Sequence, residues 1–189
     1  MLVMRPITSK YLPDLNQLIW VRQENQLKRR QAIGGEGSAL IDLVRLEPDP
    51  ELRPVGMWDD NNLVAAFVLQ CAQPGTGWSE WGRGGPSLLV SHAHTHPEER
   101  ARFKIITPWL RDYAARAVDG PTWPRCTVRD LKLAEYLEQQ CGWRCVGSVV
   151  RGWERPRYLL EAVPECIEIG ALIRSEGELA AVTVREGAP

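Results

Sequence analysis

The sequence lacks the features that mark membrane, secreted and general DNA-binding proteins. Its apolar runs fall short of the about 20 residues that cross a bilayer, and residues 1–10 have neither the apolar stretch nor the cleavage site of a secretory signal. A net charge of -1 excludes the strongly basic balance of a general nucleic-acid-binding domain. The five cysteines form no C-x-x-C pair, so neither a disulfide framework nor a thiolate zinc site is indicated. We therefore predict a soluble cytoplasmic protein.

The length and composition of the chain suit one folded domain followed by a C-terminal extension. The 189 residues, 44% of them hydrophobic, suffice to bury a sizeable core without disulfide bonds. Residues 1–163 are expected to form the main domain. Residues 164–189 are expected to form a C-terminal extension, either a hairpin or a strand plus a helix, because Cys166–Arg174 and Glu178–Arg185 flank the turn-like Ser175-Glu176-Gly177.

Apolar spacing in the main domain predicts a mixture of strands and helices. Spacing near 3.6 residues predicts helices, and short apolar runs between turn residues predict strands. A hairpin in the middle and a strand–helix–strand crossover after it indicate the fold class α/β (α+β), a central twisted sheet of mixed strand direction flanked by helices. The predicted strands are Leu2–Pro6, Val55–Trp58, Leu63–Cys71, Ser87–Thr95, Cys126–Val128, Cys145–Arg151 and Arg157–Ala162, and the predicted helices are Tyr11–Val21, Ala39–Leu46, Phe103–Ala117 and Leu131–Cys141, with Arg22–Arg30 as a polar stretch after the first helix.

The three histidines, His92, His94 and His96, fall in one predicted strand. A spacing of two residues puts their side chains on one face. One interpretation is a general base or substrate contact, His94 above all, because imidazole titrates near neutral pH. A second is a zinc site, which needs further ligands although the chain has no other histidine. The third is a set of partly buried, satisfied side chains.

Two segments carry the motifs of a known family. Residues 95–105 read Thr-His-Pro-Glu-Glu-Arg-Ala-Arg-Phe-Lys-Ile beside the family pattern V-x-P-x-x-R-G-x-G-x-G, and residues 134–143 fit A-x-x-L-Y-x-x-x-G-F. With the order of elements, most of residues 1–162 resembles the GNAT superfamily of acyl-CoA-dependent N-acyltransferases. Ala101, Phe103 and Ile105 stand where the family has glycines, so the pyrophosphate-binding loop is degenerate. Pro108 is expected in the first turn of the helix that follows.

The resemblance implies a GNAT-like fold and a transfer of an acetyl or related acyl group from a CoA thioester to the amine of a small molecule. Acetyl-CoA or another acyl-CoA is then the co-substrate, and no metal is expected. His94 and His92 are the expected bases, and Tyr136 is the expected general acid. In the family this loop and the helix start after it hold the CoA pyrophosphate. The residues expected to bind CoA are Thr95, His96, Arg100, Ala101, Arg102, Phe103 and Lys104.

Two other functions stay open at this point. The missing glycines favour an acyltransferase that takes its acyl group from a carrier protein or an aminoacyl-tRNA. The third candidate is a non-catalytic binding or regulatory module that has kept the fold, because a fold does not fix a function. The expected partners are a small-molecule amine, no membrane, and no nucleic acid other than tRNA. A homodimer is compatible with all three.

Overall fold

The computed structural model describes residues 1–31, 34–46, 49, 51–72, 78, 85–98, 103–117, 120, 122–150 and 155–183. Within them, one mixed sheet of eight strands, flanked by helices, has the hydrogen-bonded order β6-β7-β5-β4-β3-β2-β1-β8. The predicted mixed α/β fold is therefore confirmed. None of the helices in these ranges is long and apolar enough to cross a membrane.

The strands are β1 (Leu2–Pro6), β2 (Leu52–Asp59), β3 (Asn62–Ala72), β4 (Ser87–Thr95), β5 (Trp123–Val128), β6 (Arg144–Val149), β7 (Arg157–Glu161) and β8 (Ile173–Ser175). The helices are α1 (Leu12–Lys28), α2 (Glu36–Arg45), α3 (Phe103–Ala115), α4 (Leu131–Cys141) and α5 (Glu178–Thr183), with a 3-10 turn at Ser9–Tyr11.

The chain divides into two compact units. The first contains Met1–Leu69, His92–Phe103 and Glu168–Pro189, and the second contains Gln70–Ser91 and Lys104–Ile167. Strands β3 and β4 pass from one unit into the other. The C-terminal end of β4, which carries the histidines, therefore belongs to the first unit.

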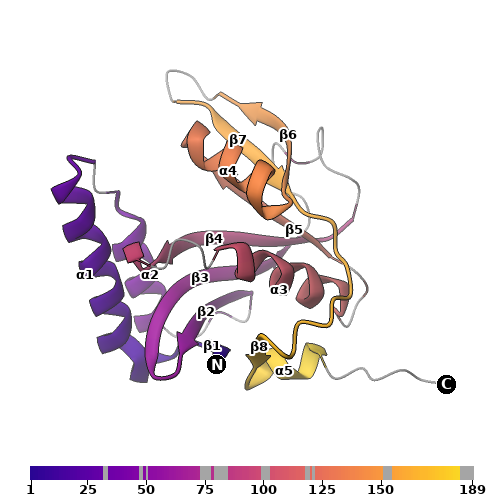
Figure 1. The fold of residues 1–189 in the computed structure, drawn as a ribbon, viewed down its shortest axis with the longest axis horizontal. Coiled ribbons are helices and arrows are strands. Elements are labelled where there is room, and N and C mark those ends of the chain that lie inside the picture. The colour runs from indigo at the N-terminus through magenta and orange to yellow at the C-terminus, as the bar shows by residue number, and fades with distance from the viewer. Residues whose placement is uncertain are drawn as a thin grey trace. The chain divides into compact units, whose positions relative to one another are not determined.

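The first unit is built on helices α1 and α2, which lie side by side (Figure 1). β1 pairs antiparallel with β2, so that Leu2 lies opposite Asp59. Gly37 lies where α2 approaches α1: a Cβ there would come within 2.8 Å of Ile19 Cγ2. The two helices and the strands share one apolar cluster, formed by Ile7, Leu15, Leu18, Ile19, Leu40, Val44, Trp58, Leu63, Ala66 and Val68.

After Pro164 the chain adds β8 and α5 to the first unit. β8 pairs parallel with β1, so that Leu2 lies opposite Ile173. The backbone N–H of Glu176 donates to the Met4 carbonyl at 2.9 Å, and Arg5 Nε donates to Glu176 Oε2 at 2.7 Å. The addition therefore covers one edge of the sheet.

The second unit holds a row of charged side chains across its strands. Glu161 on β7 lies opposite Arg125 on β5 and opposite Arg144 on β6. Arg125 and Glu161 are buried; Arg125 Nε lies 3.6 Å from Glu161 Oε2, and Arg125 Nη1 donates to Ser87 Oγ on β4 at 2.7 Å. A shift of one residue in β5 or β7 separates these buried charges. The row therefore specifies the strand register.

Helices α1, α2 and α3 differ from those predicted, and α2 begins at Glu36 rather than at Ala39. Helix α1 continues through the polar stretch to Lys28, because Gln, Glu, Arg and Lys are good helix formers and Lys28 Nζ lies 3.0 Å from Glu24 Oε1 one turn earlier. Pro108 lies in the second turn of α3 rather than the first. It lacks the N–H that would bond to the Lys104 carbonyl, so α3 tolerates one missing hydrogen bond.

Candidate functional site

The C-terminal half of β4 combines an unusual backbone with the three histidines. His92 has a φ of 49°, in the left-handed region that residues other than glycine rarely adopt and in which histidine is enriched. Strained backbone of this kind concentrates at functional sites. Since His92 is not extended, the regular alternation of side chains along a strand does not hold at this residue. His94 and His96 each line a cavity beside α1, and His92 lines neither of these two cavities.

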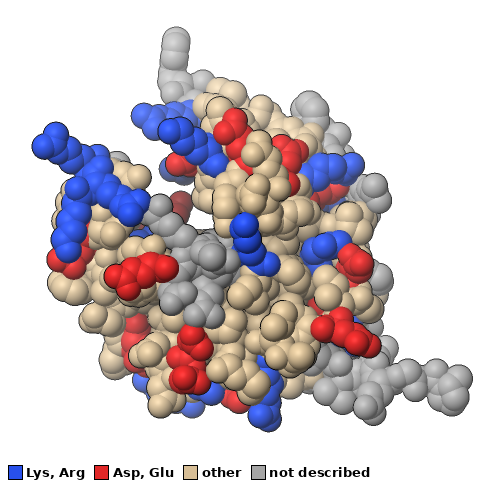
Figure 2. Space-filling view, viewed as in Figure 1, with Lys and Arg blue, Asp and Glu red and all other residues tan. Residues whose placement is uncertain are grey.

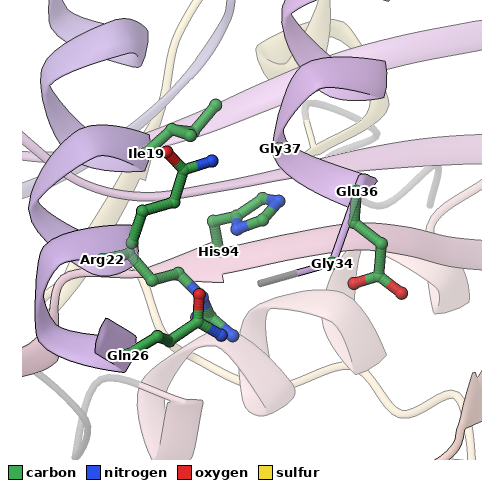
Figure 3. A pocket seen from close by; sticks show the side chains of 8 residues that line it. Ile19, Arg22, Gln26, Gly34, Glu36, Gly37 and His94 are labelled. Atoms are coloured by element: carbon green, nitrogen blue, oxygen red, sulfur yellow. The ribbon is translucent and has the colours of Figure 1, made fainter. Parts of the chain in front are cut away.

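His94 is almost completely buried, with 6% of its surface exposed. Its ring lies between α1 and α2 and lines a cavity of about 30 Å³ (Figure 3). Neither ring nitrogen forms a hydrogen bond of ordinary geometry with the part of the chain that the structure describes. The other lining residues are Ile19, Arg22, Gln23 and Gln26 from α1, and Gly34, Glu36 and Gly37 from the start of α2.

The surroundings of His94 keep its ring neutral. Burial lowers its pKa to about 4, the positive charge of Arg22 and then the neighbouring His92 act in the same direction, and the backbone of Glu36 acts against them. A neutral imidazole carries one N–H donor and one nitrogen with a free lone pair. At pH 7 His94 is therefore able to accept a proton, and a group that offsets Arg22 would make it a stronger base.

His96 lines a second and larger cavity of about 300 Å³. Its backbone N–H donates to the Val64 carbonyl at 2.8 Å, and its ring Nδ1 accepts the Glu98 backbone N–H at 3.4 Å. Leu63 and Val64 form part of an apolar floor, and none of the described lining residues is Lys or Arg. The remaining lining residues are Asp14, Gln17, Leu18, Val21, Asn61 and Asn62.

The residues expected to bind CoA are distributed over both units. Thr95 ends β4 and is buried. Phe103 begins α3 in the first unit. Lys104 belongs to the second unit, where its Nζ donates to Gln140 Oε1 at 3.2 Å. Arg100, Ala101 and Arg102 lie outside the described residues.

Tyr136, the expected general acid, lies on α4 in the second unit. Burial raises its pKa, and the adjacent Cys141 adds to the effect. Tyr136 therefore stays protonated at neutral pH, which is the state that a proton donor requires. Asp130 caps the start of this helix by accepting the Lys132 backbone N–H at 2.8 Å, and Gly142 ends it with a φ of 73°.

The walls of the His94 cavity were not predicted from the sequence. Arg22, Gln23 and Gln26 were assigned to a polar stretch, but Arg22 lies four residues and Gln23 three residues before Gln26, so both flank Gln26 on one broad face of α1. Gly37 stands inside a helix, where glycine is unfavourable unless a close approach requires it. These two signals were present in the sequence. Their meaning depends on α1 and α2 packing over His94, which periodicity does not reveal.

The three histidines do not form a metal centre. Among the residues that the structure describes, no group of three or more His, Cys, Asp or Glu side chains is arranged to hold a metal ion. The zinc interpretation of the histidine spacing therefore has no support in the geometry.

Several solved acetyltransferases have a similar fold. An aminoglycoside N(6')-acetyltransferase from Legionella pneumophila matches with a TM-score of 0.60 and 9% identity, over 85% of this chain and 91% of that one. A GNAT-family acetyltransferase from Streptococcus agalactiae matches with a TM-score of 0.60 and 13% identity, over 87% and 96%. Spermidine N-acetyltransferase from Vibrio cholerae, in complex with CoA and spermine, matches with a TM-score of 0.57 and 14% identity, over 86% and 95%. No family model and no curated protein matches the sequence.

Proposed function

Since the chain has the GNAT fold, we propose that it is an N-acyltransferase that moves an acetyl or related acyl group from a CoA thioester to the amine of a small molecule. The observation that carries this proposal is His94, a buried and neutral histidine whose ring nitrogens lack hydrogen-bond partners in the described part of the chain. It lines a cavity at the end of β4, where the family resemblance places the reacting groups.

The proposed reaction forms a C–N bond and breaks a C–S bond. The amine nitrogen attacks the acyl carbonyl carbon, and the electron pair of the C–S bond leaves with the CoA sulfur. The amine loses one proton, which His94 accepts on the nitrogen that carries its lone pair. Backbone N–H groups of β4 are the proposed donors to the oxyanion that forms in between.

The donor side of the proposal follows the resemblance. Thr95, His96 and the loop that leads into α3 are proposed to hold acyl-CoA, with Lys104 and the start of α3 near its phosphates, because helix N-termini attract anions. Tyr136 is proposed to return a proton to the departing thiolate. His92 is proposed to assist His94, whose pKa it already affects.

An amine acceptor is supported by the neighbours in fold. One of them binds CoA and spermine in its solved structure, and another is an aminoglycoside acetyltransferase. Spermine and aminoglycosides are both amines, although they differ in size and shape. The similarity in fold therefore supports an amine as acceptor and leaves its other chemistry to the cavity itself.

Calorimetry and thermal shift with CoA, acetyl-CoA and AMP test the donor. We expect saturable binding and a higher melting temperature with the first two, and a smaller effect with AMP. Acylation of a panel of amines should then depend on His94, with His94→Ala inactive and folded. The absence of binding at millimolar CoA and acetyl-CoA would contradict the proposal.

The degenerate loop, with Ala101, Phe103 and Ile105 in place of glycines, favours a second candidate donor. In this version the acyl group comes from a carrier protein or an aminoacyl-tRNA. Activity with free acetyl-CoA equal to that with the carrier-bound group would contradict it. If the wild type, His94→Ala and Tyr136→Phe are equally inert with every donor, the chain is a non-catalytic module.

A further inference from the structure

The cavity at His94 has a polar wall that proton transfer alone does not require. Arg22, Gln23 and Gln26 lie on one face of α1 and line the cavity. The positive charge of Arg22 lowers the pKa of the His94 ring. Side-chain amides and a guanidinium are the groups that hold carboxylates in proteins. The wall is therefore electropositive and rich in hydrogen-bond donors.

The start of α2 adds further donors on the opposite side. Gly34 and Gly37 line the cavity, and the N-cap residue, Gly35, has no side chain to occupy the N–H groups of the first turn. These N–H groups and the helix dipole attract negative charge. Figure 3 shows the carboxylate of Glu36 turned away from the His94 ring. The one acidic side chain among the cavity residues therefore does not take this place.

His94 is an independent sign that a polar group belongs in the cavity. Buried polar atoms normally have hydrogen-bond partners, and leaving one without a partner costs free energy. Here neither ring nitrogen has a hydrogen bond of ordinary geometry within the described residues, although only 6% of the surface of the residue is exposed. The cavity of about 30 Å³ has room for about two water molecules. The two oxygens of a carboxylate occupy a similar space.

We propose that this cavity binds a carboxylate group, so that the acceptor is a small molecule carrying both an amine and a carboxylate, an amino acid in the chemical sense. This inference rests on the proposed function for the amine, and on the cavity alone for the carboxylate. Arg22, Gln26 and the first-turn N–H groups of α2 hold the carboxylate on the side away from the reacting amine.

The bound carboxylate orients the His94 ring for its role as general base. A catalytic histidine normally needs a group that accepts one ring N–H and so fixes the orientation of the ring. In the described residues His94 forms no hydrogen bond of ordinary geometry, and the backbone of Glu36 raises the pKa of the ring without forming one. The ligand carboxylate accepts the N–H, and the other ring nitrogen takes, through one bridging water, the proton that the amine loses. The acyl group and thiolate balance as above. The carboxylate also offsets Arg22 and raises the pKa of His94 from about 4.

Nuclear magnetic resonance of the imidazole groups tests the carboxylate site without any reaction. The chain has only three histidines, and His92→Gln and His96→Gln assign their signals. We expect acetate to shift the His94 signals saturably and to raise the pKa measured for His94, while acetamide, its neutral analogue, does neither. Equal effects of acetate and acetamide, or no saturable shift of His94, would overturn the inference.

Three variants locate the site. Arg22→Gln should weaken acetate binding at least 10-fold, since a charge-assisted hydrogen bond is lost, and Gly37→Ala should weaken it by narrowing the cavity. Arg29→Gln is the matched control. Arg29 follows α1 directly, in the group of Lys28, Arg29 and Arg30 where Figure 2 shows positive charge at the end of that helix, and it does not line the cavity. If Arg29→Gln weakens acetate binding as much as Arg22→Gln does, acetate is attracted by the overall positive charge of this surface, and the proposed site in the His94 cavity is wrong.

Acylation assays then separate this inference from the proposed function. We compare glycine with glycinamide as acceptors in the wild type and in Arg22→Gln. The inference predicts that the wild type prefers glycine and that Arg22→Gln loses the preference mainly through KM. Equal use of both acceptors by the wild type overturns the inference and leaves the proposed function standing. Acetate binding that depends on Arg22, without acylation of any amine, overturns the proposed function and leaves the carboxylate site standing.

Discussion

The two cavities along α1 contain histidines from the end of the same strand, yet their chemistry differs. The cavity of His94 is small and electropositive, with Arg22 and the start of α2 in its wall. The cavity of His96 is about ten times larger, and the described residues of its wall include Asp14 and Glu98 and no Lys or Arg. His94 and His96, two residues apart on β4, therefore line cavities whose walls carry charges of different sign, Arg22 in the first and Asp14 and Glu98 in the second.

Replacing each histidine by glutamine should give the largest difference between the two cavities, measured as kcat/KM. We expect His94→Gln to lower kcat/KM by about 10²- to 10⁴-fold, the usual contribution of a general base. His96→Gln should change mainly the KM for acyl-CoA, by less than about 10-fold, since a single hydrogen bond is involved. Steady-state kinetics over a range of both substrates checks this. A larger loss in His96→Gln would move the base to the other cavity.

The free energy of unfolding should depend on pH through His94. The pKa of His94 is about 4 in the folded protein and about 6.5 in the unfolded chain. The unfolded chain therefore binds the extra proton as the pH falls from 6.5 to 4, and the folded state loses on the order of 3 kcal/mol of stability. Above pH 6.5 this loss is absent.

Urea unfolding at several pH values measures the loss. In His94→Gln the decline between pH 6.5 and pH 4 should be smaller than in the wild type by about that amount, on the order of 3 kcal/mol. His96→Gln, which keeps His94, serves as the control and should follow the wild type. An identical decline in His94→Gln and in the wild type would contradict the burial of a neutral His94.

Gly37 offers a smaller effect that concerns only the His94 cavity. A Cβ at this position would lie 2.8 Å from Ile19 Cγ2, so overpacking of about 1–3 kcal/mol outweighs the gain of up to about 1 kcal/mol in helix propensity. We expect Gly37→Ala to be less stable by about 1 kcal/mol. Gly34→Ala, where a Cβ meets nothing within 4 Å, is the control, and equal stability of the two variants in urea unfolding would argue against close contact of α1 and α2.

The charged residues of the larger cavity should have the smallest effect on the His94 site, measured as a shift in the pKa of His94. Asp14 and Glu98 are exposed, so solvent and salt screen them from His94. Asp14→Asn and Glu98→Gln should shift the pKa of His94, measured by NMR, by less than about half a unit, while Arg22→Gln should raise it. A shift in Asp14→Asn as large as that in Arg22→Gln would show that the two cavities are electrostatically one.

The sequence predicted most of the elements because local patterns determine them. The hairpin at the Asp60-Asn61 turn, the β4 histidines and the α4 helix ending at Gly142 all follow from residues close in the chain. Helix α1 was predicted too short, because its second half has few apolar residues and is stabilised by helix propensity and the pair of Glu24 and Lys28.

The candidate site was predictable only in part, for a different reason. His94 was expected as a base from its residue type and the family motif. Burial is the main cause of its low pKa, and Arg22 and Glu36, which also affect that pKa, are about 60 residues or more away along the chain. Contacts of such long range depend on the packing of α1 and α2 over β4. No periodicity in the neighbourhood of His94 contains that information.

The pairing of β8 with β1 has a consequence for production and handling of the protein. Without residues 173–175, β1 would present a row of unpaired backbone N–H and C=O groups along its length, and exposed edges of this kind recruit strands from other molecules. Arg5 and Glu176 hold the short strand in place. β8 thus protects the edge of the sheet from aggregation. We expect versions of the chain that end before Ile173 to precipitate or associate more readily than the full chain.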